Sequence, residues 1–266
     1  MEATHGCPSC GGTSAWKIRR GARRCKACRR EWRPGRLPLS LARPEWRRVA
    51  RCFAHGLSCN AAAEETGLDL KRVQRAMTCL REAISLEPPE VFSGTVEVDE
   101  TYVGGRRKNQ RKDQRAVKVK HGRGTSKSVV FGILCREGKV WAEVVPDIHA
   151  ETLLPLLSKK VQPGSVVVSD TLSAYTGVAA RGYVHRLVRH DHGQYSDRKG
   201  GHINGLEGFW GYLKRRLAAR GGIRRERLPL FLAEYVWRYN HRRSSISLQT
   251  RQLMKLLEHL YMNKHA

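Results

Sequence analysis

The feature that most constrains how this chain can fold is a double Cys-x-x-Cys pattern near its start. Cys7 and Cys10 form the first pair, and 14 residues separate it from Cys25 and Cys28. The first 50 residues hold 13 Lys and Arg against three Glu and have no long apolar run, so hydrophobic burial alone cannot fold them. Four thiolates at this spacing suit tetrahedral zinc, whose binding supplies folding free energy. We therefore predict a structural zinc ribbon over residues 1–38, with one Zn²⁺ per chain.

Redox-active pairs or unpaired thiols are the alternative interpretation of this cysteine pattern. His5 is a weaker alternative ligand beside the first pair. The remaining cysteines stand singly inside apolar patterns, where a cysteine is usually a small core residue; they are Cys52, Cys59, Cys79 and Cys135.

The charge of the chain indicates its class of partner. Over 266 residues, 50 Lys and Arg face 24 Asp and Glu, which gives a net charge of +26. Such an excess is typical of a protein that binds a polyanion, so nucleic acid is the expected partner. The sequence shows neither an apolar run of membrane-spanning length nor a secretory signal, so we expect a cytoplasmic, nucleoid-associated protein.

A change of hydrophobic period predicts a small helical domain over residues 39–87. Apolar residues at three- and four-residue spacing predict a helix over 45–55, with Trp46, Val49, Ala50 and Phe53 on its buried face. Ser58 and Asp69 are expected to cap two further helices on either side of Gly67. The last of these helices has a predicted apolar stripe of Leu70, Val73, Met77 and Leu80, and its basic and polar residues are candidates for DNA contact: Lys71, Arg72, Gln74 and Arg75.

This layout is that of a helix-turn-helix, in which the second helix enters the major groove of DNA. The alternative is a helical spacer with a solvated basic face. The Pro88-Pro89 dipeptide then predicts a linker to the next domain.

The rest of the chain mixes strand and helix patterns and predicts an α/β domain with a mixed central sheet over residues 91–243, followed by a C-terminal helix within 244–266. The segment 105–127 carries ten Lys and Arg against Asp113 and is expected to be a loop that contacts phosphates. The expected strands are 95–103, 128–135, 140–145, 165–169 and 183–188, and the expected helices are 150–160, 172–180, 203–219, 228–241 and 247–262.

Three acidic residues lie in different but complementary places. Asp99 lies in the first strand, Asp170 ends a buried strand, and Glu207 lies on the helix over 203–219. Phosphodiester chemistry with two divalent cations needs carboxylates that share the ions. Taken singly, each acid also fits a plain structural role, as a charge at a strand edge, a helix cap or a solvated helix residue.

The segments 97–105 (EVDETYVGG), 169–175 (SDTLSAY) and 202–210 (HINGLEGFW), followed by Lys214 and 238–242 (RYNHR), resemble bacterial insertion-sequence transposases of the zinc-ribbon, ISXO type. The resemblance extends over nearly the whole chain. It implies a zinc ribbon followed by a ribonuclease-H-like DDE domain, two Mg²⁺ or Mn²⁺ ions in each active site, and at least a homodimer in the complex with DNA.

Transferred by position, the resemblance makes Asp99, Asp170 and Glu207 the catalytic, magnesium-binding triad and Lys214 a DNA contact, with Arg106, Arg107 and Lys108 as further DNA-binding candidates. Some relatives carry Asn at the third acidic position. This chain has both Asn204 and Glu207; Glu207 is the prediction, and Asn204 and His202 are auxiliary candidates.

The implied activity is cleavage at the ends of the element and joining of the freed 3′-hydroxyls to target DNA. Two alternatives stay open: a DNA-binding regulator that is a catalytically inactive transposase derivative, and a structure-selective nuclease.

Overall fold

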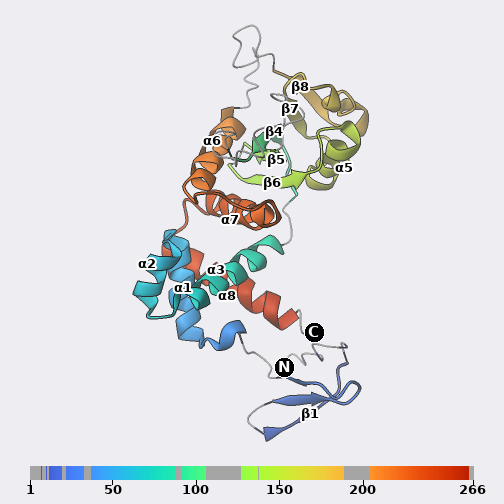
Figure 1. Cartoon of the computed structure of the whole chain (residues 1–266). Helices are drawn as coiled ribbons and strands as arrows, with labels where there is room; N and C mark the ends of the chain where they lie inside the picture. Colours follow the sequence, from blue (N-terminus) through green and yellow to red (C-terminus); the bar gives the residue numbers. More distant parts are fainter. Residues whose placement is uncertain are drawn as a thin grey trace, which may run out of the picture. The chain divides into compact units, whose positions relative to one another are not determined.

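The computed structural model describes residues 7, 10, 12–19, 22–32, 37–87, 91–105, 127–136, 138–188 and 204–263. The chain divides into two compact units (Figure 1). The first comprises Met1–Glu87 with Arg243–Ala266, and the second comprises Pro88–Arg242. Within the described residues, no helix is long and apolar enough to cross a membrane.

The chain begins with a small three-stranded antiparallel sheet. Its strands are β1 (Ala15–Lys17), β2 (Arg23–Cys25) and β3 (Glu31–Trp32), in the order β1-β2-β3. Among the described residues up to Glu31, only Cys7, Ala22 and Cys25 are buried. These residues therefore contribute almost no apolar core to the sheet.

Within the described residues, four α-helices make up the rest of the first unit. They follow a short 3₁₀ turn, η2 (Pro38–Ser40), and are α1 (Arg43–His55), α2 (Cys59–Thr66), α3 (Leu70–Ser85) and α8 (Ile246–Asn263). The C-terminal helix α8 packs against both α1 and α3. An ion pair of 2.7 Å between Arg43 and Glu258 also joins α8 to the start of α1.

The expected caps of α2 and α3 are present. The Ser58 hydroxyl accepts a hydrogen bond from the Ala61 N–H at 3.1 Å, and the Asp69 carboxylate accepts one from the Arg72 N–H at 2.9 Å. Gly67 ends α2 with a φ of 69°, a left-handed conformation that glycine adopts without strain.

The predicted buried face of α1 is confirmed, since Trp46, Val49, Ala50 and Phe53 are all buried. The predicted stripe of α3 is wrong at one position. Leu70 is 39% exposed because it is the first residue of the helix and precedes the part that packs, whereas Val73, Met77 and Leu80 are buried.

The second unit is built on a five-stranded sheet with the order β6-β5-β4-β7-β8. Neighbouring strands are antiparallel from β4 to β6, and β4, β7 and β8 run parallel. This is the mixed, ribonuclease-H-like α/β arrangement that the resemblance implies. The strands are β4 (Thr95–Val103), β5 (Ser128–Cys135), β6 (Val140–Val145), β7 (Val166–Ser169) and β8 (Val184–Leu187).

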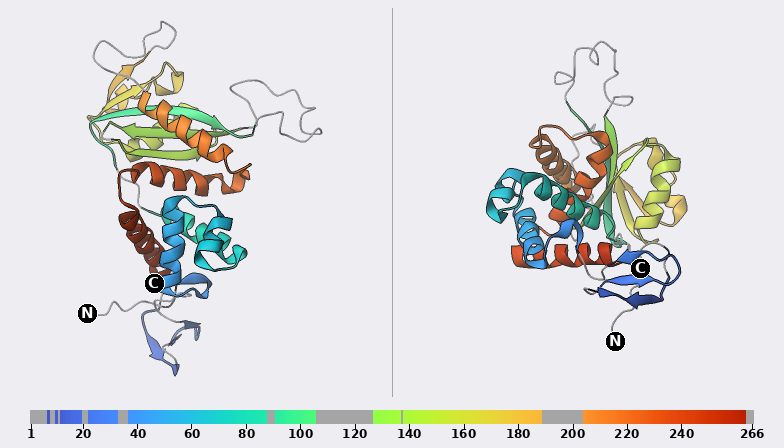
Figure 2. Two further views of the ribbon diagram at one scale, coloured as in Figure 1. Left: turned by 90° about the vertical axis from the view of Figure 1, so that its left-hand side faces the viewer. Right: turned by 60° about the horizontal axis from the view of Figure 1, so that its bottom comes forward.

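Helices cover both faces of this sheet (Figure 2). On one face lie α5 (Ala150–Lys160) and two short 3₁₀ turns, η4 (Ser173–Tyr175) and η5 (Ala179–Arg181). On the other lie α6 (Asn204–Ala218) and α7 (Leu228–Asn240), preceded by η7 (Arg225–Arg227). Each face has its own apolar core, centred on residues such as Phe131 and Leu157 on the first face and Phe209 and Leu213 on the second.

The expected helix over 172–180 is wrong. The segment forms the separate turns η4 and η5 instead. The Asp170 carboxylate accepts a hydrogen bond from the Leu172 N–H at 2.9 Å, and this short turn leads directly into η4. Each 3₁₀ turn is closed by i→i+3 hydrogen bonds, as short connections often are.

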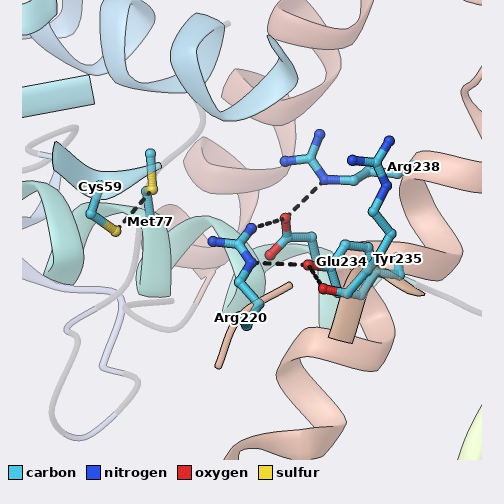
Figure 3. A network of polar contacts seen from close by, with 7 residues as sticks. Cys59, Met77, Arg220, Glu234, Tyr235 and Arg238 are labelled. Carbon is cyan, nitrogen blue, oxygen red and sulfur yellow. Dashed lines mark hydrogen bonds and ion pairs between the residues drawn. The ribbon is translucent and has the colours of Figure 1, made fainter. Parts of the chain in front are cut away.

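A buried ionic network joins the end of α6 to α7 (Figure 3). The Glu234 side chain is fully buried and accepts hydrogen bonds from Arg238 at 2.8 Å and Arg220 at 3.4 Å. Arg220 also donates to the Tyr235 hydroxyl at 3.0 Å. The two guanidinium groups compensate the negative charge of Glu234, and this makes the burial of the carboxylate tolerable.

The side chain of Asn240 pairs with the backbone of the edge strand β6. Its amide nitrogen donates to the Val140 carbonyl, and its amide oxygen accepts from the Val140 N–H, both at 2.8 Å. Asn240 therefore satisfies one donor and one acceptor at the edge of the sheet, and it gives the 238–242 segment a structural role.

Candidate active site

Asp99 occupies the middle of β4, where the strand crosses the sheet. Its side chain is half-buried, and its Oδ2 accepts a hydrogen bond from the Trp210 indole N–H at 2.9 Å. Burial raises the pKa of Asp99 from 3.8 to about 6; the Trp210 bond opposes this rise, and the nearby carboxylates of Asp170 and Glu207 add to it. A nearby cation would therefore stabilise the ionised form of Asp99.

Asp170 comes directly after β7, at the carboxyl end of that strand. Because β4 and β7 run parallel with Glu97 opposite Val168, two further residues along each strand bring Asp99 and Asp170 to neighbouring positions. The sheet register therefore explains why residues 71 positions apart in sequence meet.

Glu100 joins these two acids. Carboxylate oxygens of Asp99, Glu100 and Asp170 all lie within 4.8 Å of one another. The hydroxyl of the buried Tyr175 donates to the Glu100 carboxylate at 2.8 Å. Glu100 thus lies at the acidic edge although it follows Asp99 directly on the strand, where alternate residues point to opposite faces.

Glu207 lies in the first turn of α6 and is exposed. It is not a member of the group of three carboxylates, but it is close enough to Asp99 to raise the pKa of that residue. Oxygen donors of this kind are the ligands that Mg²⁺ and Mn²⁺ prefer, so the residues present fit a divalent cation.

The four cysteines of the ribbon also come together. Their Sγ atoms lie within 4.8 Å of one another, with 3.4 Å between Cys7 and Cys28 and 3.5 Å between Cys10 and Cys25. Zinc–sulfur bonds of about 2.3 Å in a tetrahedron place sulfurs about 3.8 Å apart, so the cluster is the right size for zinc. A backbone hydrogen bond at Arg30 and the neighbouring Cys7 thiol lower the pKa of Cys28, whereas hydrogen bonds with Cys25 and Cys28 raise the pKa of Cys10 to about 12.

The basic candidates fall in two described places. Lys71, Arg72, Gln74 and Arg75 are all exposed on α3. Lys214 is exposed on α6; partial burial and the nearby Lys127 lower its pKa, and Asp99 raises it, which places Lys214 near the acidic residues.

Several candidates lie outside the described residues. These are Arg106, Arg107 and Lys108 in the basic loop, His202 before α6, and His5 beside the first cysteine pair. Asn204 is the first residue of α6, and only its backbone is described.

Three further residues take part in this site, and the predicted triad does not include them: Glu97, Glu100 and Trp210. Trp210 also packs in the apolar core beneath α6. The spacing offered a partial signal, because Glu97 lies two residues before Asp99 on the same strand face and Trp210 lies one turn after Leu206 on the helix.

Comparison with known proteins gives consistent matches. Residues 91–240 match the model of the ISXO2-like transposase domain. An uncharacterized transposase-like protein of Haemophilus influenzae is 36% identical over 119 residues, which are 44% of this chain and 94% of that protein.

Among solved structures, the catalytic core domain of BIV integrase matches 54% of this chain and 82% of that chain, with 17% identity and a TM-score of 0.35. A pre-cleavage Mos1 transpososome matches 90% of this chain and 83% of that chain, with 10% identity and a TM-score of 0.32.

Proposed function

The chain belongs to the family of the ISXO2-like transposase domain, and from this premise we propose that it cuts the ends of an insertion sequence and joins them to target DNA. The observation that carries the proposal is the meeting of Asp99, in the middle of β4, with Asp170, at the carboxyl end of β7, in a chain with a net charge of +26. Carboxylates gathered beside a phosphate-binding surface are what metal-assisted phosphodiester chemistry requires.

In this proposal Asp99, Asp170 and Glu207 hold two divalent cations, Mg²⁺ or Mn²⁺. Bound there, the cations would lower the pKa of the attacking oxygen and stabilise charge on the leaving oxygen. Glu100 lies within 4.8 Å of two of these acids and is a further candidate ligand. Lys214, near Asp99, contacts a DNA phosphate beside the reacting bond.

The proposed reaction has two steps. A water oxygen first attacks the phosphorus at the element end; the P–O bond to the 3′-oxygen breaks, and that oxygen takes a proton to become a free 3′-hydroxyl. The 3′-hydroxyl then attacks a target phosphodiester in line, loses its proton, and displaces the 3′-oxygen of the target strand. Neither step needs a covalent bond to the protein.

The other parts of the chain are proposed to bind DNA. The zinc ribbon (1–38) and the helix-turn-helix-like domain (39–87) recognise the element ends, and α3 offers Lys71, Arg72, Gln74 and Arg75 to the major groove. Residues 91–243 form the catalytic domain, and the C-terminal helix lies within 244–266. Two ends must be held together, so the complex with DNA contains at least a homodimer.

The test is a joining assay with oligonucleotides that carry the element ends. These ends are identified from the DNA around the coding region, as short inverted repeats bounded by a direct duplication. We expect joining only with Mg²⁺ or Mn²⁺, and we expect Asp170→Asn to lower its rate by about 1,000-fold, or about 4 kcal/mol of activation free energy.

Glu151→Gln is the matched control, because Glu151 is an exposed acid in the first turn of α5. It should join DNA at the wild-type rate. Full joining by Asp170→Asn would refute the proposal. Hydrolysis without joining would identify a nuclease, and metal-independent binding of the ends with no cleavage would identify a regulator.

A further inference from the structure

Glu97 is a buried carboxylic acid that the proposed chemistry does not use. It lies in β4, two residues before Asp99, and only 1% of its surface is exposed. Burial of an acidic side chain is costly unless polar groups compensate it. The groups that contact Glu97 therefore indicate its role in the structure.

One of these contacts is with the beginning of α6. The Glu97 Oε2 accepts a hydrogen bond from the Leu206 backbone N–H at 2.9 Å. Leu206 is the third residue of α6, so its N–H is among the first four, which have no acceptor inside the helix. A carboxylate at this end also interacts favourably with the helix dipole.

Gly205 allows the carboxylate to approach this closely. A Cβ atom at position 205 would lie 3.0 Å from Oε2 and 3.2 Å from Oε1 of Glu97, and 3.1 Å from Cδ2 of Leu134. A side chain at position 205 would therefore require a shift of a few tenths of an ångström in Glu97, in Leu134 or in the first turn of α6. The glycine therefore serves a close contact in a helix that would otherwise favour alanine.

A second contact joins the same two elements one helical turn further on. Trp210 donates its indole N–H to Asp99 at 2.9 Å. Its ring lies over Gly132, the residue opposite Asp99 on β5, where a Cβ would meet the Trp210 ring at 2.5 Å. Because Gly132 has no side chain, the Trp210 ring has room to reach Asp99 with its indole N–H.

The two contacts match in spacing. Glu97 and Asp99 are two residues apart on one face of a strand, about 6.6 Å along it. Leu206 and Trp210 are four residues apart on one face of a helix, about 6.0 Å along its axis. Together the contacts fix both the translation of α6 along β4 and its rotation, and Glu207 follows Leu206 directly.

We propose that Glu97 is a positioning residue: by binding the first turn of α6, it sets Trp210 against Asp99 and directs Glu207 toward Asp99 and Asp170. The inference rests on the proposed function for the roles of the three acids. The position of α6 can nevertheless be measured without DNA and without metal.

The test compares two pairs of matched variants. Gly205→Ala adds one methyl group facing Glu97, and Gly208→Ala adds the same group one turn later, where a Cβ meets nothing within 4 Å. Glu97→Met removes the acceptor at similar length, and Glu97→Gln restores an acceptor oxygen. None of these changes touches an acid of the proposed triad.

Two measurements on the whole chain report the result. The first is the NMR signal of the Trp210 indole N–H in metal-free protein, assigned with Trp210→Phe. The second is the affinity for Mn²⁺, followed by electron paramagnetic resonance well below each unfolding temperature. We expect Gly205→Ala and Glu97→Met to shift the indole signal and to weaken Mn²⁺ binding about tenfold, as the loss of groups that orient metal ligands does.

Gly208→Ala and Glu97→Gln should keep the wild-type signal and Mn²⁺ affinity within about twofold. An unchanged indole signal in folded Gly205→Ala would overturn the inference, as would an equal shift in Gly208→Ala. If Glu97→Met does not fold, the glycine pair decides the question. A wild-type protein that joins no DNA would refute the proposed function, whereas the indole signals would still report the role of Glu97.

Discussion

The cysteine cluster and the carboxylate cluster are both suited to metal ions, but the protein supports them in opposite ways. Around the cysteines, only Cys7, Ala22 and Cys25 are buried among the described residues up to Glu31. The carboxylates instead stand on a five-stranded sheet with an apolar core on each face. The first cluster is held by a small hydrogen-bonded sheet with little buried apolar surface, and the second is held by a sheet with a core on each face.

The difference predicts what each metal would contribute. We expect zinc in the ribbon to replace a missing hydrophobic core, so that folding and metal binding are one event. The acidic residues are held by the fold itself, and the partial burial of Asp99 raises its pKa at some cost in stability. The protein should therefore respond differently to removal of the two metals, because one supports folding and the other supports chemistry.

The largest expected effect is that of zinc removal. Binding of structural zinc contributes about 10–16 kcal/mol in zinc-finger peptides, so a strong chelator, or Cys25→Ser, should unfold the ribbon completely. The measurement is loss of dispersed amide NMR signals from residues 12–32, together with metal analysis that finds about one zinc per wild-type chain. The domain with the five-stranded sheet should keep its unfolding temperature in the same sample. Purified protein that holds no zinc but retains a folded ribbon would contradict the prediction.

The next effect tests whether the sheet domain depends on protein groups rather than on metal. Glu234→Ala removes the buried carboxylate that Arg220 and Arg238 share, and should lower the free energy of unfolding by about 3–5 kcal/mol in urea titrations without metal. Glu226→Ala, at an exposed acid in η7, should change it by less than about 0.5 kcal/mol. Equal effects of the two changes would remove the contrast with the ribbon.

The smallest effect concerns the cost of holding Asp99. Its pKa in the folded chain is about 6 against an ordinary value of 3.8, so its contribution to stability is fully present below about pH 4 and is lost as the pH rises through about 6. In metal-free buffer, Asp99→Asn should therefore be more stable than the wild type at pH 7.5, by on the order of 2 kcal/mol, and the difference should vanish near pH 4.

Urea titrations at the two pH values measure this difference, and Mn²⁺ should stabilise the wild type more than Asp99→Asn at pH 7.5. A constant difference between the two proteins from pH 4 to pH 7.5 would show that Asp99 ionises as freely in the folded chain as in the unfolded one.

The sequence predicted the parts of this structure that depend on local pattern. Alternation located β4, helical periodicity located α1, and Ser58 and Asp69 cap the helices that they were expected to cap. The expectation for 172–180 failed because its apolar residues pack from two short turns as well as they would from a helix, and composition does not distinguish the two.

The contacts that organise the acidic site were beyond that reasoning because they join distant segments. More than 100 residues separate Glu97 from Leu206 and Asp99 from Trp210. The alternation of a strand also predicts that Glu100 points away from Asp99. It does not reveal that Asp170, which follows the end of the neighbouring strand, is within reach of both.

The pairing of Asn240 with Val140 has a consequence for crowding and solubility. An unpaired edge strand invites a strand from another molecule, and this is a common route to aggregation. Because the Asn240 side chain already occupies one N–H and one C=O of β6, an intruding strand would have to displace it. One amide side chain at the end of α7 therefore opposes self-association at that edge of the sheet.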